Sequence, residues 1–315
     1  MNAMKLPIDA PLNLPPQLQG RVLFNEPLAQ YTSWRVGGPA DVLFKPANRE
    51  DLALFLKSLP LDTPVFWLGL GSNVLIRDGG LRAVVIETHG ALSSLERLSD
   101  TEVWCDAGVP CAKLAKHCAK WNLGPAEFFA GIPGTLGGAL AMNAGAFGGE
   151  TWRHVVEVET INRQGEIKRR LESEYEVAYR HVRQRDPQHE EWFLGACLSF
   201  SVSDANGEAE IRALLQRRKE AQPIGEPSGG STFTNPPGHH AAKLIESAGL
   251  KGLRVGGAAV STKHANFIIN EGKATAADIE LLILKVADAV RDKFGVTLTP
   301  EVRIVGEPLT GTEQT

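Results

Sequence analysis

The stretch Gly131–Glu150, GIPGTLGGALAMNAGAFGGE, has the composition of a binding loop lined by backbone. Seven of its twenty residues are Gly, and each Gly costs conformational entropy on folding, so the concentration indicates backbone that must approach something closely. Successive main-chain N–H groups form a binding site for anions such as phosphate. A flexible linker is the alternative, but linkers lack packing residues such as Leu136, Met142 and Phe147. We therefore expect an ordered, buried loop around an anionic ligand.

A second glycine loop, Gly69-Leu70-Gly71-Ser72-Asn73, stands between two predicted strands. It is not a dinucleotide fingerprint, because the third Gly would fall at Val74 and a strand, not a helix, follows. The Ser72 and Asn73 side chains add hydrogen-bonding groups to the backbone donors of the turn. A pyrophosphate needs donors on both sides, so the two glycine loops together predict such a ligand better than either does alone.

Other catalytic patterns fail on single positions. A nucleophile elbow centred on Ser231 would need Gly where Phe233 stands. His189-Glu190 is not followed by the second His of a zinc-protease motif. The four cysteines lack metal-ligand spacing, so we expect no metal and reduced, partly buried thiols in a cytoplasmic protein.

Length and charge limit the remaining classes of protein. A chain of 315 residues suggests two or three domains. The net charge of −4 argues against a partner that is nucleic acid or a membrane surface. The first twenty residues are rich in Pro and read as a loosely held arm rather than a signal segment.

The elements that must position these loops follow from periodicity and end signals. The turn Gly37–Pro39 separates two short β-like runs, Trp34–Val36 and Asp41–Phe44. Asn48 reads as the N-cap of a helix whose apolar face ends near Leu59. Further helices are predicted at 111–121, 208–221, 240–247 and 276–294, the last with Thr275 as N-cap, Asp278 three residues later and Gly295 as its stop. Further strands are predicted at 65–68, 74–77, 83–87, 103–105, 154–162, 166–171, 193–202 and 266–269.

Taken together, several ordered motifs resemble the UDP-N-acetylenolpyruvoylglucosamine reductases, flavoenzymes of bacterial cell-wall synthesis. The resemblance runs from about Tyr31 to Gly306 and rests on WRVGGPAD, GLGSNVLIRDGG, the 131–150 stretch, Tyr179-Arg180, QP–PSGGSTFTNPPG–AAKLIESAGLKG, VSTKHANFIIN and PEVRIVG. It implies an α+β fold: a flavin-binding region of the vanillyl-alcohol-oxidase (PCMH) type in two lobes, then an α+β substrate domain. The implied boundaries are an arm at 1–20, lobes at about 21–90 and 91–204, the substrate domain at 208–306 and a tail at 307–315.

The resemblance also implies the reaction. NADPH reduces non-covalent FAD, the flavin passes hydride to C3 of the enolpyruvyl group of UDP-N-acetylglucosamine enolpyruvate, and the product is UDP-N-acetylmuramate. The protein would then be a cytoplasmic monomer that supports peptidoglycan synthesis, cell shape and division. Arg180 and Glu301 would polarise the substrate carboxylate, and Ser231 would deliver the proton to C2.

Binding residues are likewise implied by matching motif positions. Those expected to contact the cofactor are Arg35, Gly69, Gly71, Ser72, Asn73, Gly131, Ile132, Pro133, Gly134, Thr135, Gly138, Asn143 and Gly145. Those expected to contact the substrate are Tyr179, Asn235, Lys263 and His264.

This chain departs from many relatives at three places. Thr234 and Val182 stand where a Lys and a Ser are common, and only Ser203–Gly207 separates the last strand of the second lobe from the next helix. The chain therefore resembles the branch without an inserted, substrate-clamping Tyr loop. Two alternatives stay open: an FAD-dependent oxidase of the same fold, and a nucleotide-sugar-binding protein that has lost catalysis.

Overall fold

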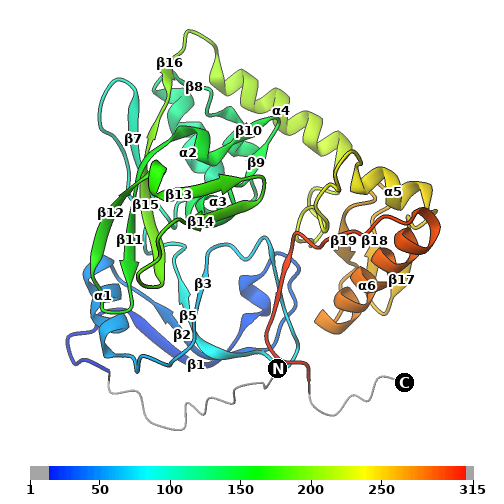
Figure 1. The fold of residues 1–315 in the computed structure, drawn as a ribbon, viewed down its shortest axis with the longest axis horizontal. Helices are drawn as coiled ribbons and strands as arrows, with labels where there is room; N and C mark the ends of the chain where they lie inside the picture. The colour runs from blue at the N-terminus through cyan, green and yellow to red at the C-terminus, as the bar shows by residue number, and fades with distance from the viewer. Residues whose placement is uncertain (1–13, 310–315) are drawn as a thin grey trace. The chain divides into compact units, whose positions relative to one another are not determined.

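The computed structural model describes residues 14–309, and they divide into two units. The first unit holds residues 14–23, 42–70 and 83–217, and the second holds 24–41, 71–82 and 218–309. Four of the five division points fall inside β1 (Arg21–Pro27), β2 (Pro39–Lys45), β5 (Leu81–Glu87) and α4 (Gly207–Ala221), which Figure 1 labels, and the fifth lies between residues 70 and 71. With β3 (Val65–Leu68), these three strands form a four-stranded sheet in the order β1-β2-β5-β3, in which β3 and β5 run parallel.

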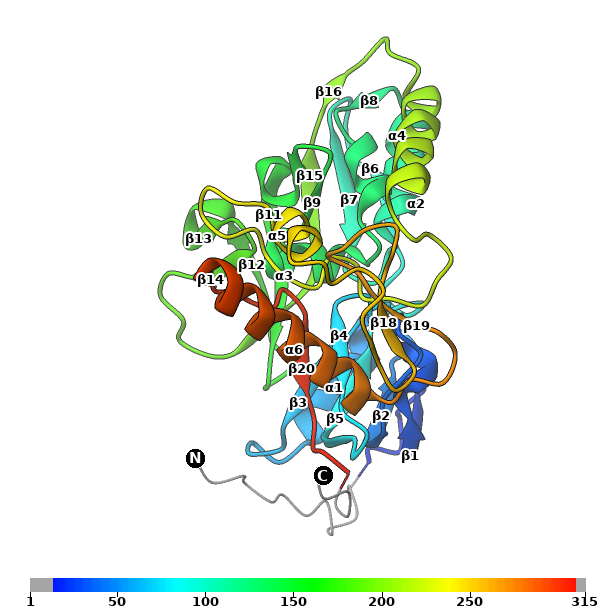
Figure 2. The same ribbon diagram turned by 90° about the vertical axis from the view of Figure 1, so that its right-hand side faces the viewer.

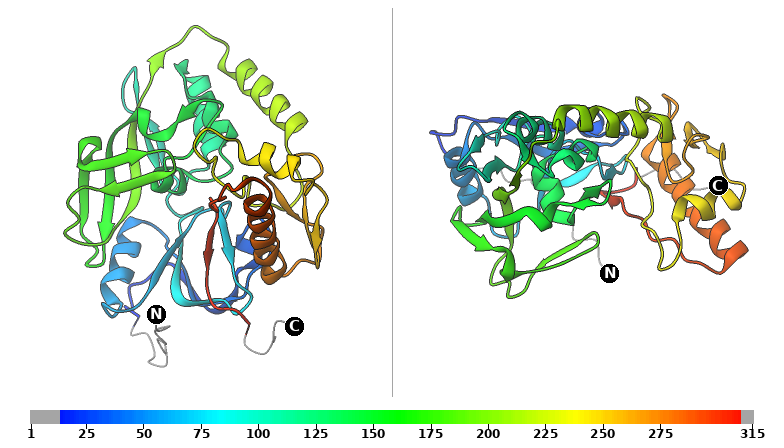
Figure 3. Two further views of the ribbon diagram at one scale, coloured as in Figure 1. Left: turned by 45° about the vertical axis from the view of Figure 1, so that its right-hand side comes forward. Right: turned by 90° about the horizontal axis from the view of Figure 1, so that it is seen from above.

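The first unit is built on a five-stranded antiparallel sheet of order β12-β11-β15-β7-β6. Its long strands are the green arrows of Figure 3. Their bounds are β6 Leu95–Arg97, β7 Glu102–Asp106, β11 Val155–Asn162, β12 Ile167–Leu171 and β15 Glu191–Ser199. The helices of this unit are α1 (Arg49–Ser58), α2 (Cys111–Lys120) and α3 (Leu136–Met142). Short pairs complete it: β8 (Leu123–Gly124) with β16 (Ser201–Val202), β9 (Gly145–Ala146) with β10 (Gly149–Glu150), and β13 (Tyr175–Ala178) with β14 (His181–Gln184).

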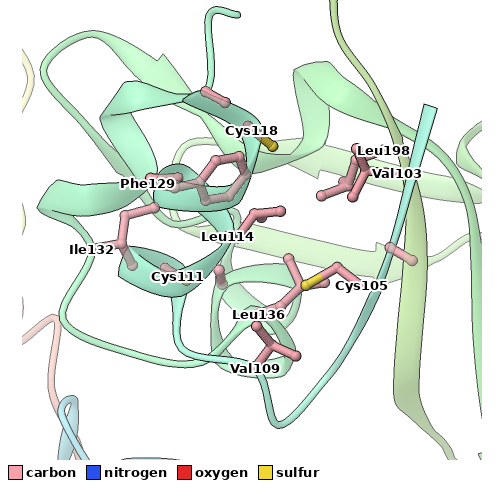
Figure 4. Close-up of a cluster of buried hydrophobic side chains, with 14 of the residues drawn as sticks. Val103, Cys105, Val109, Cys111, Leu114, Cys118, Phe129, Ile132, Leu136 and Leu198 are labelled. Carbon is pink, nitrogen blue, oxygen red and sulfur yellow. The ribbon is translucent and has the colours of Figure 1, made fainter. Parts of the chain in front are cut away.

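Two hydrophobic cores stabilise the first unit. One packs α1 against β2, β5 and the parallel strand β3, and includes the stacked rings of Phe44 and Phe55. The other packs α2, α3 and the five-stranded sheet, and it holds the buried thiols of Cys105, Cys111 and Cys118 (Figure 4). Each Å² of apolar surface that is buried contributes about 25 cal/mol of stabilisation, so these cores are the main support of the loops they carry.

The second unit is built round α6 (Ala276–Phe294). Its apolar face, with Ile279, Leu282 and Ile283 each at most 1% exposed, covers a three-stranded sheet of order β17-β18-β19. The strands are β17 (Arg254–Val255), β18 (Ala258–Val260) and β19 (Ile268–Asn270), and α5 (Ala241–Ser247) packs beside them. Separately, β20 (Arg303–Val305) pairs in parallel with β4 (Val74–Ile76), as Figure 2 shows.

Most elements expected from the sequence are present, and two expectations are wrong. The caps at Asn48 and at Thr275, where Thr275 and Asp278 form a capping box, are confirmed. Trp34–Val36 is not a strand, because Trp34 is fully buried in the hydrophobic core of the second unit and its indole N–H donates to the Ile268 carbonyl. Leu136–Met142 is a helix within the stretch expected to be a loop. Short 3₁₀ helices occur at Leu28–Tyr31, Glu127–Gly131, Thr151–His154 and Glu172–Glu174.

The predicted N-terminal arm lies mostly outside the described residues. Within its described end, the N–H groups of Gln19 and Gly20 donate to the Asp51 carboxylate at 2.7 and 2.8 Å. Residues 310–315 of the predicted tail also lie outside the described part of the chain. None of the helices described is long and apolar enough to cross a lipid bilayer.

Candidate active site

The glycine stretch is held against the core by its own backbone. The N–H groups of Leu136 and Gly137 donate to the carbonyls of Val109 and Ala107 at 2.9 and 2.8 Å. The N–H of Cys111 donates to the Gly134 carbonyl at 2.9 Å. These bonds dock the first turn of α3 on the turn before α2, and they explain how a segment of low helix propensity becomes a helix.

The outward side of this segment presents almost bare backbone. Pro133 and Gly138 are exposed, and a Cβ added to Gly138 would have Thr135 Oγ1, 4.0 Å away, as its nearest neighbour. Thr135 itself is buried, and a Cβ on Gly69 would lie only 2.5 Å from its Oγ1. The two glycine loops therefore meet at the Gly69–Thr135 contact. An open strip of backbone bordered by both loops fits a flat, anionic cofactor such as FAD.

Other predicted cofactor residues of the first unit have structural reasons for their type. A Cβ on Gly131 would lie 2.5 Å from the Phe147 ring, and one on Gly145 would lie 2.3 Å from the Gly149 carbonyl oxygen. Ile132 is 7% exposed and belongs to the α2–α3 core. Gly131 and Gly145 are thus required by packing inside the unit, whether or not they also border a ligand.

Tyr179 and Arg180 form the two-residue turn between β13 and β14. Tyr179 is 52% exposed, and the Arg180 guanidinium carbon lies 4.9 Å from the centre of its ring. Arg180 has a φ of 55°, which is uncommon for a residue with a long side chain. Its Nη1 donates to the main-chain carbonyl of Asn143 at 3.4 Å, so the structure brings the predicted catalytic Arg180 to the end of α3, within the glycine stretch.

Ser231 and Glu301 lie on neighbouring segments of the second unit. The Glu301 N–H donates to the Thr232 carbonyl at 2.8 Å, and Phe233 forms an isolated β-bridge with Pro300. The Asn73 side chain donates to the Glu301 carbonyl at 3.1 Å. The structure therefore gathers the backbones of three predicted site segments, around Asn73, Ser231 and Glu301. Ser231 is half-buried, and a Cβ on the preceding Gly230 would meet nothing within 4 Å.

Two buried polar atoms of the second unit have no hydrogen-bond partner among the described residues. They are Thr232 Oγ1 and His264 Nδ1. Burial lowers the pKa of His264, and the nearby charge of Lys251 lowers it further. An orphaned buried polar group is costly, so these two atoms suit a place that receives a polar ligand or water.

The remaining predicted residues of the second unit have mixed surroundings. Gly71 has a φ of 58°, and a Cβ there would lie 2.1 Å from the Tyr31 carbonyl oxygen, whereas Arg35 is exposed with a φ of 58°. Ser72 is half-buried in the turn before β4. Asn235 accepts the N–H of Ala241 at 3.0 Å and so caps α5, and the Lys263 ammonium donates to the Lys219 carbonyl.

Sequence reasoning missed Asn266 and Asn270. Asn266 is 5% exposed and clamps the Ser231 segment: its carbonyl accepts from Thr232 at 2.8 Å, its Oδ1 accepts from Phe233 at 3.0 Å, and its Nδ2 donates to Phe233 at 2.8 Å. Asn270 Nδ2 donates to the Trp34 carbonyl at 2.9 Å. Two side-chain amides four residues apart within the apolar run HANFIIN could have indicated structural hydrogen bonds, because a buried amide must have partners.

Comparison with known proteins gives a consistent result over most of the chain. Residues 222–305 match the model of the UDP-N-acetylenolpyruvoylglucosamine reductase C-terminal domain, and residues 40–170 match an FAD-binding domain. The UDP-N-acetylenolpyruvoylglucosamine reductase of Alkalilimnicola ehrlichii is 58% identical over 283 residues, which cover 90% of this chain and 94% of that protein. The chain belongs to the UDP-N-acetylenolpyruvoylglucosamine reductase family.

Two further members agree with this assignment. The enzyme of that name from Legionella pneumophila strain Corby is 56% identical over 291 residues, 92% of this chain and 94% of its own. The crystal structure of the reductase from Thermus caldophilus has a TM-score of 0.76 at 31% identity and covers 91% of this chain and 98% of that one. The family resemblance, the α+β fold with its FAD-binding region and C-terminal domain, and the FAD cofactor expected from the sequence are confirmed.

Proposed function

We propose that this protein reduces the enolpyruvyl group of UDP-N-acetylglucosamine enolpyruvate to give UDP-N-acetylmuramate, with NADPH as reductant. The observation that carries the proposal is the 58% identity to a reductase of that name across both the FAD-binding and C-terminal regions. The product is a precursor of peptidoglycan, so the enzyme serves cell-wall synthesis, cell shape and division. We also propose a cytoplasmic monomer with the domain boundaries expected from the sequence.

The residues that would hold FAD are those bordering the open backbone strip. Gly138 and Pro133 leave its outer side clear, and the Gly69–Thr135 contact closes one end. When bound, FAD would supply the hydride chemistry between NADPH and C3 of the enolpyruvyl group. The protein's part is to bind the ring system, to exclude water and to act on the substrate's carboxylate and C2.

Arg180 and Glu301 act on the carboxylate. Hydride addition at C3 pushes charge toward the carboxylate and makes an enolate-like acid, which a planar guanidinium can hold with two hydrogen bonds. The strained turn and the Asn143 carbonyl fix the direction of Arg180 before substrate arrives. Glu301 is proposed to share the developing charge by donating a hydrogen bond to the same group.

Ser231 gives the proton that completes the reaction at C2. Its segment is tied to Glu301 on one side and to Asn266 on the other, so the hydroxyl is carried by backbone with little freedom. A positioned acid of this kind contributes about 10²- to 10⁴-fold to the rate. Tyr179, Asn235, Lys263 and His264 are proposed to contact the sugar nucleotide.

Anaerobic half-reactions test the proposal. The purified yellow protein is first titrated with NADPH, which should bleach the flavin band, and the enolpyruvyl sugar nucleotide is then added, which should restore it with formation of UDP-N-acetylmuramate. Reoxidation by O₂ alone, with no response to the sugar nucleotide, would favour the oxidase alternative. Binding of the sugar nucleotide without any redox change would favour the catalytically silent alternative.

A further inference from the structure

We propose that Asn143 is a positioning residue whose side chain holds the Tyr179–Arg180 turn, and thereby aims the Arg180 guanidinium. The inference rests on the role of Arg180 in the proposed function. It gives Asn143 a task other than the direct cofactor contact expected from the sequence.

The turn needs outside support because its second residue is strained. Ala178 pairs with His181 across the two-residue connection, and Arg180 has a φ of 55°. Positive φ at this position of a turn is a place for Gly or Asn, and a long side chain persists there only when its surroundings enforce it. Because β13 and β14 form a sheet of their own, no neighbouring strand of that sheet supports the turn.

The Asn143 side chain supplies that support from the end of α3. Its Nδ2 donates to the Ala178 carbonyl at 3.2 Å and to Glu150 Oε2 at 2.9 Å, and its Oδ1 accepts the Trp152 N–H at 3.1 Å. Its main-chain carbonyl accepts from Arg180 Nη1 at 3.4 Å. Asn143, which is 2% exposed, therefore bonds both to the backbone just before the turn, at Ala178, and to the guanidinium of Arg180 within it.

The residue type at this position supports the same conclusion. Asn143 ends α3 in the left-handed conformation, with φ 45° and ψ 53°. Gly is the usual residue at such a helix end, and Asn is the side chain that tolerates it best. Gly would satisfy the backbone but would leave the Ala178 carbonyl and the Trp152 N–H without these bonds. The use of Asn is explained by what its amide holds.

The first test measures the turn itself, by trypsin cleavage of the full-length, flavin-loaded protein after Arg180. Asn143→Gly keeps the left-handed backbone and removes the amide, so cleavage at the Arg180–His181 bond should become several-fold faster. Asn122→Gly is the matched control, because Asn122 is also left-handed (φ 56°) in the same unit but is exposed. Unchanged cleavage in Asn143→Gly, measured by mass spectrometry, would overturn the proposal.

The second test separates aiming of Arg180 from binding of flavin. Asn143→Gly should slow anaerobic reoxidation by the enolpyruvyl substrate about 10- to 100-fold, as expected for a misplaced catalytic group, while FAD affinity and bleaching by NADPH stay within about twofold. Loss of FAD affinity with equal loss in both half-reactions would overturn the proposal in favour of direct cofactor binding. If Asn143→Gly does not fold, Asn143→Asp decides, since it keeps the acceptor for Trp152 and loses the donors to Ala178 and Glu150.

A third comparison keeps this inference distinct from the proposed function. With Arg180→Ala as background, adding Asn143→Gly should slow reoxidation little further, because the group being aimed is already absent. If Arg180→Ala alone reoxidises at the normal rate, the proposed role of Arg180 fails, whatever trypsin reports about the turn. If the two losses simply multiply, Asn143 acts independently of Arg180 and the present inference is wrong.

Discussion

The main-chain N–H of Glu301 donates a 2.8 Å hydrogen bond to the carbonyl of Thr232, next to Ser231. Ser231 and Glu301, the proposed proton donor and the proposed carboxylate partner, are thus carried on backbone segments that are hydrogen-bonded to each other although they are 70 positions apart in sequence. Thr234 and Thr299 extend the pairing with a 3.0 Å bond. Substitution of either side chain should therefore change chemistry without releasing the segment, because the segment is held through main-chain atoms.

Ser231→Ala should separate the two half-reactions. NADPH should bleach the flavin at nearly the wild-type rate, whereas anaerobic reoxidation by the enolpyruvyl substrate should fall about 10²- to 10⁴-fold for want of a positioned acid. Stopped-flow absorbance of the flavin band measures both rates. Ser231→Cys should recover part of the second rate, since a thiol also donates a proton. A normal reoxidation rate in Ser231→Ala would exclude Ser231 as the acid and direct attention to His264.

Arg180→Lys should lose most of the substrate half-reaction although it keeps the charge. Lys acts as a point charge and cannot hold a carboxylate with two parallel N–H groups, so a loss of about 10-fold or more is expected in reoxidation. NADPH bleaching should be unaffected. The control is Arg183→Lys on the neighbouring exposed strand position. Equal behaviour of the two variants would mean that Arg180 has a structural role only.

Gly138→Val tests whether the open side of α3 faces the cofactor. The protein itself leaves room for the added side chain, with Thr135 Oγ1 at 4.0 Å as the nearest atom, so the variant should fold. It should nevertheless lose flavin, because the new side chain fills the space over the backbone. Flavin per protein by absorbance and folding by circular dichroism are the measurements. Ala277→Val, at an exposed position of α6, is the control. A Gly138→Val protein that retains FAD at wild-type strength would refute the site.

A feature of the fold or the site could be predicted from the sequence where the contacts that produce it are local in the chain. The capping box of α6 lies within four residues, Thr275 to Asp278, so the sequence predicts both the cap and the bounds of the helix. Helix α3 could not be predicted in this way, because its first N–H groups bond to the carbonyls of Val109 and Ala107 and its own glycines disfavour a helix. The hydrogen bonds between Asn266 and Phe233 join residues 33 positions apart, and no local sequence pattern predicts such a pair.

The cysteines should be inert in the folded protein. Burial raises the pKa of Cys111 and of Cys118 to about 12, and that of Cys197 to about 11. Burial also raises the pKa of Cys105 well above its usual value. The thiolate is the reactive form, so Ellman's reagent at pH 8 should label almost none of them until denaturant exposes all four. Ala277→Cys should add one fast-reacting thiol as a positive control, and rapid labelling of Cys105, Cys111 or Cys118 in the wild-type protein would show that the α2–α3 core opens.

His154 should make the folded state less stable as the pH falls. Its ring stacks between Phe128 and Phe200, with centroids 5.6 and 5.0 Å away, and its Nδ1 lies 3.2 Å from the Ser199 carbonyl, which can only accept. Burial lowers the pKa of His154 below its ordinary 6.5; the bond to Ser199 opposes this shift and the charge of Arg153 adds to it. Below pH 6.5 the unfolded chain therefore binds a proton that the folded protein resists, and the free energy of unfolding falls until the pH passes below the folded-state pKa.

Urea unfolding from pH 8 to pH 5 measures this dependence. His154→Phe fits the same aromatic stack and cannot titrate, so its unfolding free energy should fall less steeply than that of the wild-type protein over this range. Loss of the Ser199 bond should lower its stability by a constant amount, about 1 kcal/mol, already visible at pH 8. Equal slopes for His154→Phe and the wild-type protein would mean that His154 takes up its proton as readily folded as unfolded, and that the Phe128–Phe200 stack does not hold it neutral.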